Sequence, residues 1–351
     1  MAKTCRQRTA ALMLLLVVSL PVLAFAAAMD NYKIGAHGTG HVVHPAWFKH
    51  SLLDLQGDLE DARAAGMRGI IIMFSQENCF HCQAFMDTTL KDKAIQQRVR
   101  QHYDVIGLDI FSDNELTYID GSVTTVKHFA EQAKARLTPT LLFIGVEGRV
   151  LVKIIGFYPP EKFTQVLDYI DSNAYQRMSL HAYLQQTRLS NTSNLAPVVY
   201  DTRLFETPPL SLQPAGDKDD RYLLVVFEAP SCNPCARFHR DVLSNQAVQA
   251  RLKDFRAVQL DVTDKEQKIT TPSGQASTPG DWANQLQINY DIAVLFFDPQ
   301  GKEVHRIDSE CGKDRLLGSM QYVLEQAYLR HEQFLQWRKE QAQKKRNNQS
   351  P

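Results

Sequence analysis

The sequence lacks most of the patterns that mark nucleotide-binding, hydrolytic or membrane-spanning proteins. No glycine-rich phosphate loop, Ser-His-Asp pattern or pair of catalytic carboxylates stands out in it. Its 39 basic residues balance its 39 acidic ones, so its charge does not favour a nucleic-acid partner. Beyond the N-terminal segment, no stretch approaches the ~20 apolar residues of a membrane-spanning helix. The chemistry must therefore be sought elsewhere, in a small number of cysteines.

The first 28 residues have the pattern of a Sec signal peptide. Basic residues precede an apolar run from Ala10 to Leu20, and the Ala-rich segment 24–28 offers a cleavage site. An uncleaved anchor is the alternative, but Pro21 and the Ala-rich end favour cleavage. We therefore expect an exported, periplasmic protein with no stable membrane insertion after signal cleavage, whose cysteines lie in an oxidising compartment.

Cysteine is scarce, with six residues in a chain of 351. Loss of Cys5 with the signal would leave five, at positions 79, 82, 232, 235 and 311. A chain of this length can bury cores of its own, which argues against a disulfide-stapled scaffold. The odd count leaves one thiol without a standing partner, and Cys311 is the one outside a motif. We expect Cys311 to be a buried or idle thiol, with a third redox partner near Cys232 as the alternative.

Four of the cysteines form two Cys-x-x-Cys motifs, and each motif follows the same kind of apolar strand. Ile70–Phe74 precedes Cys79-Phe-His-Cys82, and Leu223–Phe227 precedes Cys232-Asn-Pro-Cys235. Thiols at i and i+3 of a helix face the same way, about 5–6 Å apart at Cβ, which is close enough for a disulfide. A reversible dithiol at a strand-to-helix junction indicates redox chemistry, and we expect no cofactor beyond the redox-active disulfides.

The order of elements repeats in the two halves. In the first half, a helix expected from Pro45 to Gly66 is followed by strand, helix, strand, helix, two strands and a helix. A step of 153 residues aligns the second half with the first, pairing Cys82 with Cys235, Phe85 with Phe238, Phe143 with Phe296, and Gly148 with Gly301. Agreement at a single step over ~70 residues indicates a duplicated fold.

We therefore predict the following organisation: a signal peptide over 1–28, a first domain over 45–175, a helical segment and linker over 176–197, a second domain over 198–335, and a basic tail over 336–351. The tail is expected to be a solvated helix rather than a docking segment.

Together these features resemble the thioredoxin superfamily. The resemblance is carried by strand, Cys-x-x-Cys and helix, followed about 57 residues later by Thr138-Pro139-Thr140 before another strand. Trp47-Phe-Lys49, Leu108-Asp109 and Gly156-Phe-Tyr-Pro-Pro160 make the first half similar to exported thioredoxin-related proteins of the SoxW type. The likeness implies an α/β fold with two tandem thioredoxin-like folds, each a central mixed β-sheet flanked by helices.

The resemblance and the helix N-terminus together suggest roles for the first motif. Cys79 is the expected nucleophile, because free N–H groups and the helix dipole stabilise its thiolate. His81, when protonated, would lower the pKa of Cys79 further, and Cys82, one turn inside, is the expected resolving thiol. A Phe-His pair stabilises the reduced form, so this site should be more oxidising than the Asn-Pro site of Cys232 and Cys235.

The resemblance also implies where substrates bind. Pro139 would be cis and lie against the disulfide, and the Thr138 backbone would pair with an incoming substrate strand. Phe80 and His81, between the cysteines, would contact the same substrate. The second half departs from this pattern, because Ile292 stands at the position of Pro139. A non-proline cis bond costs about 2.5–4 kcal/mol, so we expect a trans bond there and an altered or absent groove.

The predicted function is thiol–disulfide exchange with protein substrates through the first motif, with the second domain as a second redox site or a docking module. The resemblance implies protein thiol or disulfide partners and a membrane electron donor of the CcdA/DsbD type. Both halves lack the Asp that thioredoxins bury six residues before the first Cys, and have Met73 and Val226 there. A redox-inactive binding or chaperone protein is an alternative interpretation.

Metal binding is a further alternative. The two motifs are separated by 149 residues, too many for a zinc knuckle, and neither is followed by His, which excludes covalent haem attachment. A Cu(I) metallochaperone would use the soft thiolates. His37, His41, His44 and His50 could add ligands, although their irregular spacing favours ordinary surface histidines. We predict no resident metal.

Overall fold

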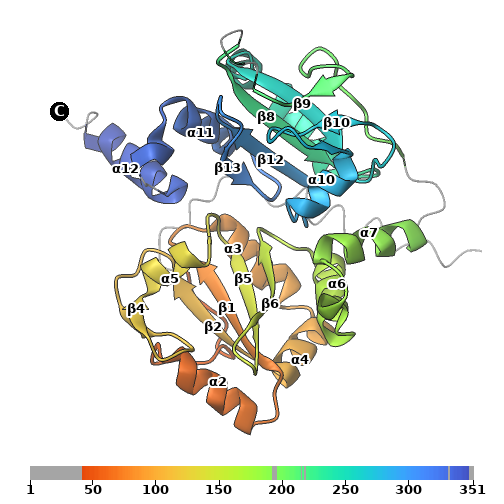
Figure 1. Cartoon of the computed structure of the whole chain (residues 1–351). Helices are drawn as coiled ribbons and strands as arrows, with labels where there is room; N and C mark the ends of the chain where they lie inside the picture. The colour runs from red at the N-terminus through yellow and green to blue at the C-terminus, as the bar shows by residue number, and fades with distance from the viewer. Residues whose placement is uncertain (1–41, 192–195, 215, 217–218, 331–332, 348–351) are drawn as a thin grey trace, which may run out of the picture. The chain divides into compact units, whose positions relative to one another are not determined.

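The computed structural model describes residues 42–191, 196–214, 216, 219–330 and 333–347. The predicted signal peptide lies outside these residues, as do His37, His41 and residues 192–195 of the predicted linker. Within the described ranges, no helix is both long and apolar enough to cross a bilayer. Figure 1 shows a central sheet with flanking helices in each half of the chain.

The first half alternates helices and strands. Its elements are α2 (Leu55–Ala64), β1 (Gly69–Ser75), α3 (Phe80–Ala84), the π-helix η1 (Phe85–Thr89), α4 (Lys93–His102), β2 (Tyr103–Asp109), β3 (Glu115–Thr117), β4 (Val123–Thr125), α5 (Val126–Gln132), β5 (Thr140–Gly145), β6 (Val150–Ile155) and α6 (Pro160–Asp171). The 3-10 helix η2 (Ala174–Gln176) and α7 (Leu180–Asn191) follow.

The second half repeats this order after a short strand. Its elements are β7 (Leu210–Ser211), β8 (Tyr222–Glu228), α8 (Asn233–Arg237), the π-helix η4 (Phe238–Leu243), α9 (Gln246–Leu252), β9 (Phe255–Asp261), β10 (Ile269–Thr270), β11 (Ala276–Ser277), α10 (Pro279–Gln285), β12 (Ile292–Phe297), β13 (Glu303–Ile307) and α11 (Lys313–Leu324). The 3-10 helix η5 (Ala327–Arg330) and α12 (Phe334–Asn347) end the described chain.

Both halves have a four-stranded mixed sheet with the same pairing. In the first, the order is β2-β1-β5-β6, with β1 parallel to β2 and antiparallel to β5. In the second, the order is β13-β12-β8-β9, which is the same arrangement read from the other edge. A register shift occurs at Phe143/Ile144 and again at Phe296/Phe297, one step of 153 residues later. The predicted α/β class with two mixed sheets is confirmed.

The core of each half positions a cysteine motif. All seven residues of β1 are buried, as are all seven of β8, which is the burial expected of a central strand covered on both faces. Below the first motif, the Phe85 ring packs edge-on against Phe163 of α6, with centroids 5.2 Å apart. The strand end, and with it the start of the following helix, is therefore held by packing on both sides.

The helix predicted from Pro45 to Gly66 is wrong in its first part. Helix α2 begins only at Leu55, after the N-cap Asp54, whose side chain accepts a hydrogen bond from the Gly57 N–H. The backbone before α2 makes a hydrogen bond to the sheet instead of helical ones: the Lys49 N–H donates to the Val105 carbonyl of β2. The apolar residues between 47 and 59 recur at helical spacing, although they belong to two different structures, an irregular segment and a helix.

The helix expected after the second strand of the first half is α5, which ends at Gln132. The polar stretch before it, from residue 112 to 126, contains the small hairpin of β3 and β4. Hairpins of this length have too few alternating positions to stand out in a sequence.

The predicted tail begins inside α12, and its first turn is not solvated. Phe334, Leu335 and Trp337 are buried, with Trp337 only 2% exposed. The Trp337 ring packs edge-on against Tyr322 of α11, with centroids 5.4 Å apart. The expectation of a solvated helix is therefore wrong for this turn, whose aromatic residues belong to the core of the second half.

Replacing Trp337 by Ala should destabilise the protein by about 3–5 kcal/mol, because it removes a large buried ring and leaves a cavity. Gln343→Ala, an exposed change on the same helix, should alter the free energy of unfolding by less than about 0.5 kcal/mol. Urea unfolding of the two variants measures both values. A loss below about 1 kcal/mol for Trp337→Ala would contradict the docking of α12.

Candidate functional site

Each Cys-x-x-Cys motif closes a disulfide at the start of a helix. Cys79 is bonded to Cys82 and Cys232 to Cys235, with a Cα–Cα distance of 5.2 Å in both. The first cysteine of each pair is the N-cap, and its Sγ accepts a hydrogen bond from the backbone N–H of the second, at 3.2 Å for Cys82 and 3.0 Å for Cys235. A donor is thus already aimed at the sulfur on which a thiolate would form.

The chain enters both helices through the same unusual backbone conformation. Asn78 and Ser231, each just before the first cysteine, have φ angles of 55° and 52°. This left-handed conformation is uncommon outside glycine, and Asn adopts it more readily than most residues. Its recurrence after a step of 153 residues shows that the two junctions are built alike.

The first disulfide is enclosed by the predicted substrate residues. Cys79 is 7% exposed and Cys82 fully buried, while Thr138 Oγ1 lies 3.3 Å from Cys79 Sγ. The Thr138–Pro139 peptide bond is cis, as the resemblance implies. Phe80 is half-buried on α3, and its ring meets that of His81 edge-on at 5.3 Å. The structure therefore gathers the predicted residues of the first half around one disulfide.

The charge predicted for His81 does not fit its surroundings. Burial, together with the smaller effect of Arg315 on α11, lowers the pKa of His81 to about 4. The imidazole is therefore neutral at neutral pH, and its charge does not help to lower the pKa of Cys79. The positive charge near this centre comes instead from Arg315, a residue of the second half.

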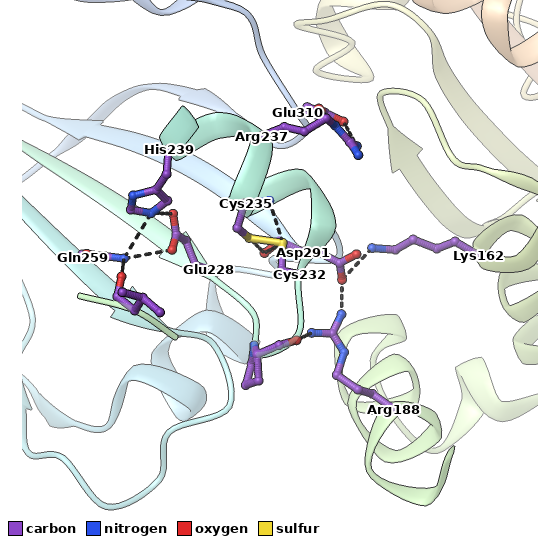
Figure 2. The surroundings of a disulfide bond; sticks show 12 residues. Lys162, Arg188, Glu228, Cys232, Cys235, Arg237, His239, Gln259, Asp291 and Glu310 are labelled. Atoms are coloured by element: carbon purple, nitrogen blue, oxygen red, sulfur yellow. Dashed lines mark hydrogen bonds and ion pairs between the residues drawn. A yellow bond between two sulfur atoms is a disulfide. The ribbon is translucent and has the colours of Figure 1, made fainter. Parts of the chain in front are cut away.

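Different groups lie against the second disulfide. The backbone oxygen of Asp291 lies 3.4 Å from Cys235 Sγ and 3.7 Å from Cys232 Sγ. The Asp291–Ile292 bond is not among the cis bonds of the described residues, in agreement with the trans bond expected. Figure 2 shows that the Asp291 carboxylate is paired with Lys162 and Arg188, which come from α6 and α7. None of these partnerships was foreseen from the sequence.

A buried polar network behind the second disulfide was also missed. Glu228, only 2% exposed, accepts hydrogen bonds from His239 Nε2 at 2.8 Å and from Gln259 Nε2 at 2.9 Å (Figure 2). The equivalent positions of the first half hold Ser75, Met86 and Ile106. Aligning the halves at 153 residues would have revealed this change, in which a serine and two apolar residues of the first half correspond to Glu228, His239 and Gln259.

The remaining predicted residues are apolar or unreactive in place. Met73 and Val226, at the positions of the missing acid, are buried in β1 and β8. Cys311 is a free thiol, and burial raises its pKa to about 12. It therefore stays protonated at neutral pH, which favours the idle thiol over a third redox partner.

The described histidines of the N-terminal region do not form a metal site. His44 Nε2 lies 3.2 Å from Ser75 Oγ, and the His44 ring stacks on Phe48. Across the part of the chain that the structure describes, no group of three or more His, Cys, Asp or Glu side chains is arranged to hold a metal ion.

Comparison with known proteins identifies the fold of both halves. The family model for a thioredoxin-like domain matches residues 55–171 and again residues 209–324, which together exceed half of the chain. The predicted tandem thioredoxin-like folds are confirmed, whereas the finer likeness to SoxW-type proteins stays a prediction. No curated protein matches the sequence.

Three solved structures illustrate the similarity. A thioredoxin-fold protein from Helicobacter pylori is 18% identical, covering 42% of this chain and 94% of its own, with a TM-score of 0.34. A thioredoxin from Thermus thermophilus is 18% identical, covering 36% and 88%, with a TM-score of 0.28. The C-terminal domain of DsbD from Neisseria meningitidis, in the reduced form, is 16% identical, covering 31% and 87%, with a TM-score of 0.24. Each covers less than half of this chain.

The His239–Glu228 pair should make stability depend on pH. The hydrogen bond to Glu228 raises the pKa of His239 against the opposing effect of burial. The pair therefore stabilises the folded state fully below the unfolded pKa of histidine, about 6.5. This stabilisation is lost as the pH rises through the raised pKa of His239 in the folded protein.

The difference in free energy of unfolding between the natural chain and His239→Gln should therefore be largest near pH 6 and shrink toward pH 8.5. Urea unfolding of the oxidised protein, with free thiols blocked after denaturation, measures it. A difference that grows with pH would show that His239 is held neutral.

Proposed function

This chain belongs to the family of thioredoxin-like domains over both of its halves, and from that membership we propose that it is a thiol–disulfide oxidoreductase. The observation that carries the proposal is the Cys79–Cys82 disulfide at the start of α3, where the Cys82 N–H already donates to Cys79 Sγ. A sulfur held in this way is a good leaving group and a stable thiolate, which are the two properties that disulfide exchange requires.

The exchange proceeds in two steps that balance in either direction. In the oxidising direction, a substrate thiolate attacks Cys79 Sγ, a substrate–Cys79 disulfide forms, and the electron pair of the broken bond leaves on Cys82 as a thiolate. A second substrate thiolate then attacks its own partner sulfur in the mixed disulfide and releases Cys79. The substrate gains a disulfide and the protein holds two thiols; the reverse sequence reduces a substrate disulfide.

The first half is the proposed site for protein substrates. Thr138 lies against its disulfide and is joined to Pro139 by a cis bond, and an extended substrate would pair with the backbone at Thr138. In the second half, the place of Thr138 is taken by Asp291, whose carboxylate is already held by two cations of the chain. This difference supports different roles for the two disulfides, with Cys232 and Cys235 as a second, internal redox centre.

The proposed setting is the periplasm, reached through the signal peptide pattern of residues 1–28. There the proposed partners are protein thiols or disulfides, with a membrane electron donor of the CcdA/DsbD type to reset the cysteines. Fractionation of cells that produce the full chain tests the location: recovery with the cytosolic fraction would contradict it.

Cys79→Ser should abolish disulfide exchange at the first centre, lowering the rate of reduction of a disulfide-bonded model peptide by about two orders of magnitude or more, because serine is not a nucleophile at neutral pH. Cys82→Ala should instead trap a covalent peptide–Cys79 adduct, because the resolving thiol is missing. The matched control is Cys311→Ala, which removes a buried free thiol and should leave the rate unchanged.

Site-resolved alkylation across a glutathione series completes this test. The proposal fails if Cys79→Ser keeps the natural rate, or if both disulfides stay oxidised down to about −300 mV, which is the behaviour of structural disulfides. In that case the chain is a binding protein with a thioredoxin-like fold.

A further inference from the structure

A cleft of about 650 Å³ is lined by both halves of the chain. Strands β6 and β13, each the outermost strand of its sheet, contribute to the lining, together with the segments that lead into β5 and β12. A volume of this size is typical of sites that hold a ligand. None of the described cysteines lines the cleft, so it is distinct from both disulfide centres.

The first half gives the cleft most of its positive charge. Lys134 and Arg136 precede β5, and Lys153 lies on β6. One step of 153 residues later, the second half has Gln287, Asn289 and Arg306 at the corresponding places of the lining. The cleft is therefore built from equivalent parts of the two halves, but only the first half supplies a cation at every one of these places.

Two acids of the second half also line the cleft, and each is met by an arginine. Glu303 accepts a hydrogen bond from Arg306 Nε at 2.6 Å and lies 3.6 Å from a guanidinium nitrogen of Arg136. Asp308 lies 3.4 Å from Arg306. The two arginines are thus matched by two acids, whereas the two lysines of the lining form no ion pair with a described residue.

The two lysines can both receive an anion. Lys134 is exposed and Lys153 is half-buried. The Lys153 ammonium donates to the Ala133 carbonyl at 3.3 Å, its one hydrogen bond to a described residue, although it has three N–H groups. Burial lowers the pKa of Lys153, the Asp308 carboxyl opposes this effect, and the other cations of the cleft act in the same direction as burial. A carboxylate brought beside Lys153 would favour its charged form.

Strand β6 presents its edge to the cleft. Five residues of Val150–Ile155 line the cleft, all except Ile154, and they include side chains of both alternating faces of the strand. Among the described strands, β6 pairs only with β5. Its outer edge therefore carries main-chain N–H and C=O groups outside the sheet, to which an extended chain can add as a further strand.

The lining of the cleft leads to the first disulfide. Arg136 stands two residues before Thr138, whose Oγ1 lies 3.3 Å from Cys79 Sγ. At the end of β6, Gly156 follows directly, and its N–H donates to the Pro139 carbonyl at 2.8 Å. An extended substrate that pairs with the Thr138 backbone would thus reach the lysines of the cleft within a few residues.

We propose that this cleft binds an acidic, extended segment of the protein substrate whose disulfide is exchanged at Cys79, and that Lys134 and Lys153 select for its negative charge. This inference rests on the proposed thiol–disulfide exchange and adds the class of substrate, proteins with Asp or Glu a few residues from the exchanged cysteine. The β6 edge holds the main chain of such a segment, and the two lysines meet its carboxylates.

Peptides of different charge test the inference. Cyclic peptides with one internal disulfide carry Glu, Ser or Lys at the positions that follow one cysteine, and are mixed with pre-reduced full-length protein. The half-saturating concentration of the Glu peptide should lie about threefold to tenfold below that of the Ser peptide, with the same limiting rate, because exposed ion pairs contribute to binding and not to the chemistry at Cys79. The Lys peptide should bind more weakly than either.

In Lys134→Glu/Lys153→Glu the order of the Glu and Lys peptides should reverse, and in the milder Lys153→Gln the preference for Glu should shrink. The Ser peptide, reduced at the natural limiting rate, reports that each variant is folded. Lys93→Glu is the matched control, since it makes the same charge change at an exposed residue of the first half outside the cleft, and should keep the natural preference.

The outcomes separate the two proposals. Equal half-saturating concentrations for the three peptides, an unchanged preference in the double variant, or the same loss in Lys93→Glu would overturn the inference. A fall in limiting rate with unchanged half-saturation would also overturn it, because the lysines would then act on the reaction and not on binding. If the natural chain reduces none of the peptides, the proposed function fails instead.

Discussion

Both disulfide centres depend on one interaction, the hydrogen bond from a backbone N–H in the first turn of a helix to the sulfur of its N-cap cysteine. That bond forms only because a fully buried strand ends just before the cysteine and fixes where the helix starts. A left-handed residue then turns the chain by the required amount. The apolar core is therefore part of the redox chemistry, since any shift of the strand would move the donor away from the sulfur.

The two halves keep this junction and differ in what surrounds it. The first has the Thr138 hydroxyl beside Cys79; the second has the Asp291 carbonyl beside both sulfurs and the buried Glu228 network nearby. Duplication preserved the sheet order and even the position of a register shift in the edge pairing. Side chains around the disulfide differ between the halves, and a change there can alter the chemistry without altering the fold.

The parts that could be predicted are those that depend on local patterns. The buried strands, the helix starts and the cis Thr138–Pro139 bond all follow from residues close together in the chain or from a family motif. The cation pair on Asp291 joins segments more than 100 residues apart, and no local spacing signals such a contact. The irregular segment before α2 was misread because its apolar residues recur at helical spacing, although its backbone bonds to β2.

The Cys311 thiol can report whether the second half of the chain is folded. Among the described cysteines it alone is a free thiol, and burial keeps it protonated in the folded protein. In the oxidised, folded chain the four motif cysteines are closed in disulfides, and a label on Cys311 appears only when the second half opens. The stoichiometry of labelling thus separates two events that are easily confused in an oxidoreductase, the opening of a disulfide and the loss of the fold that holds it.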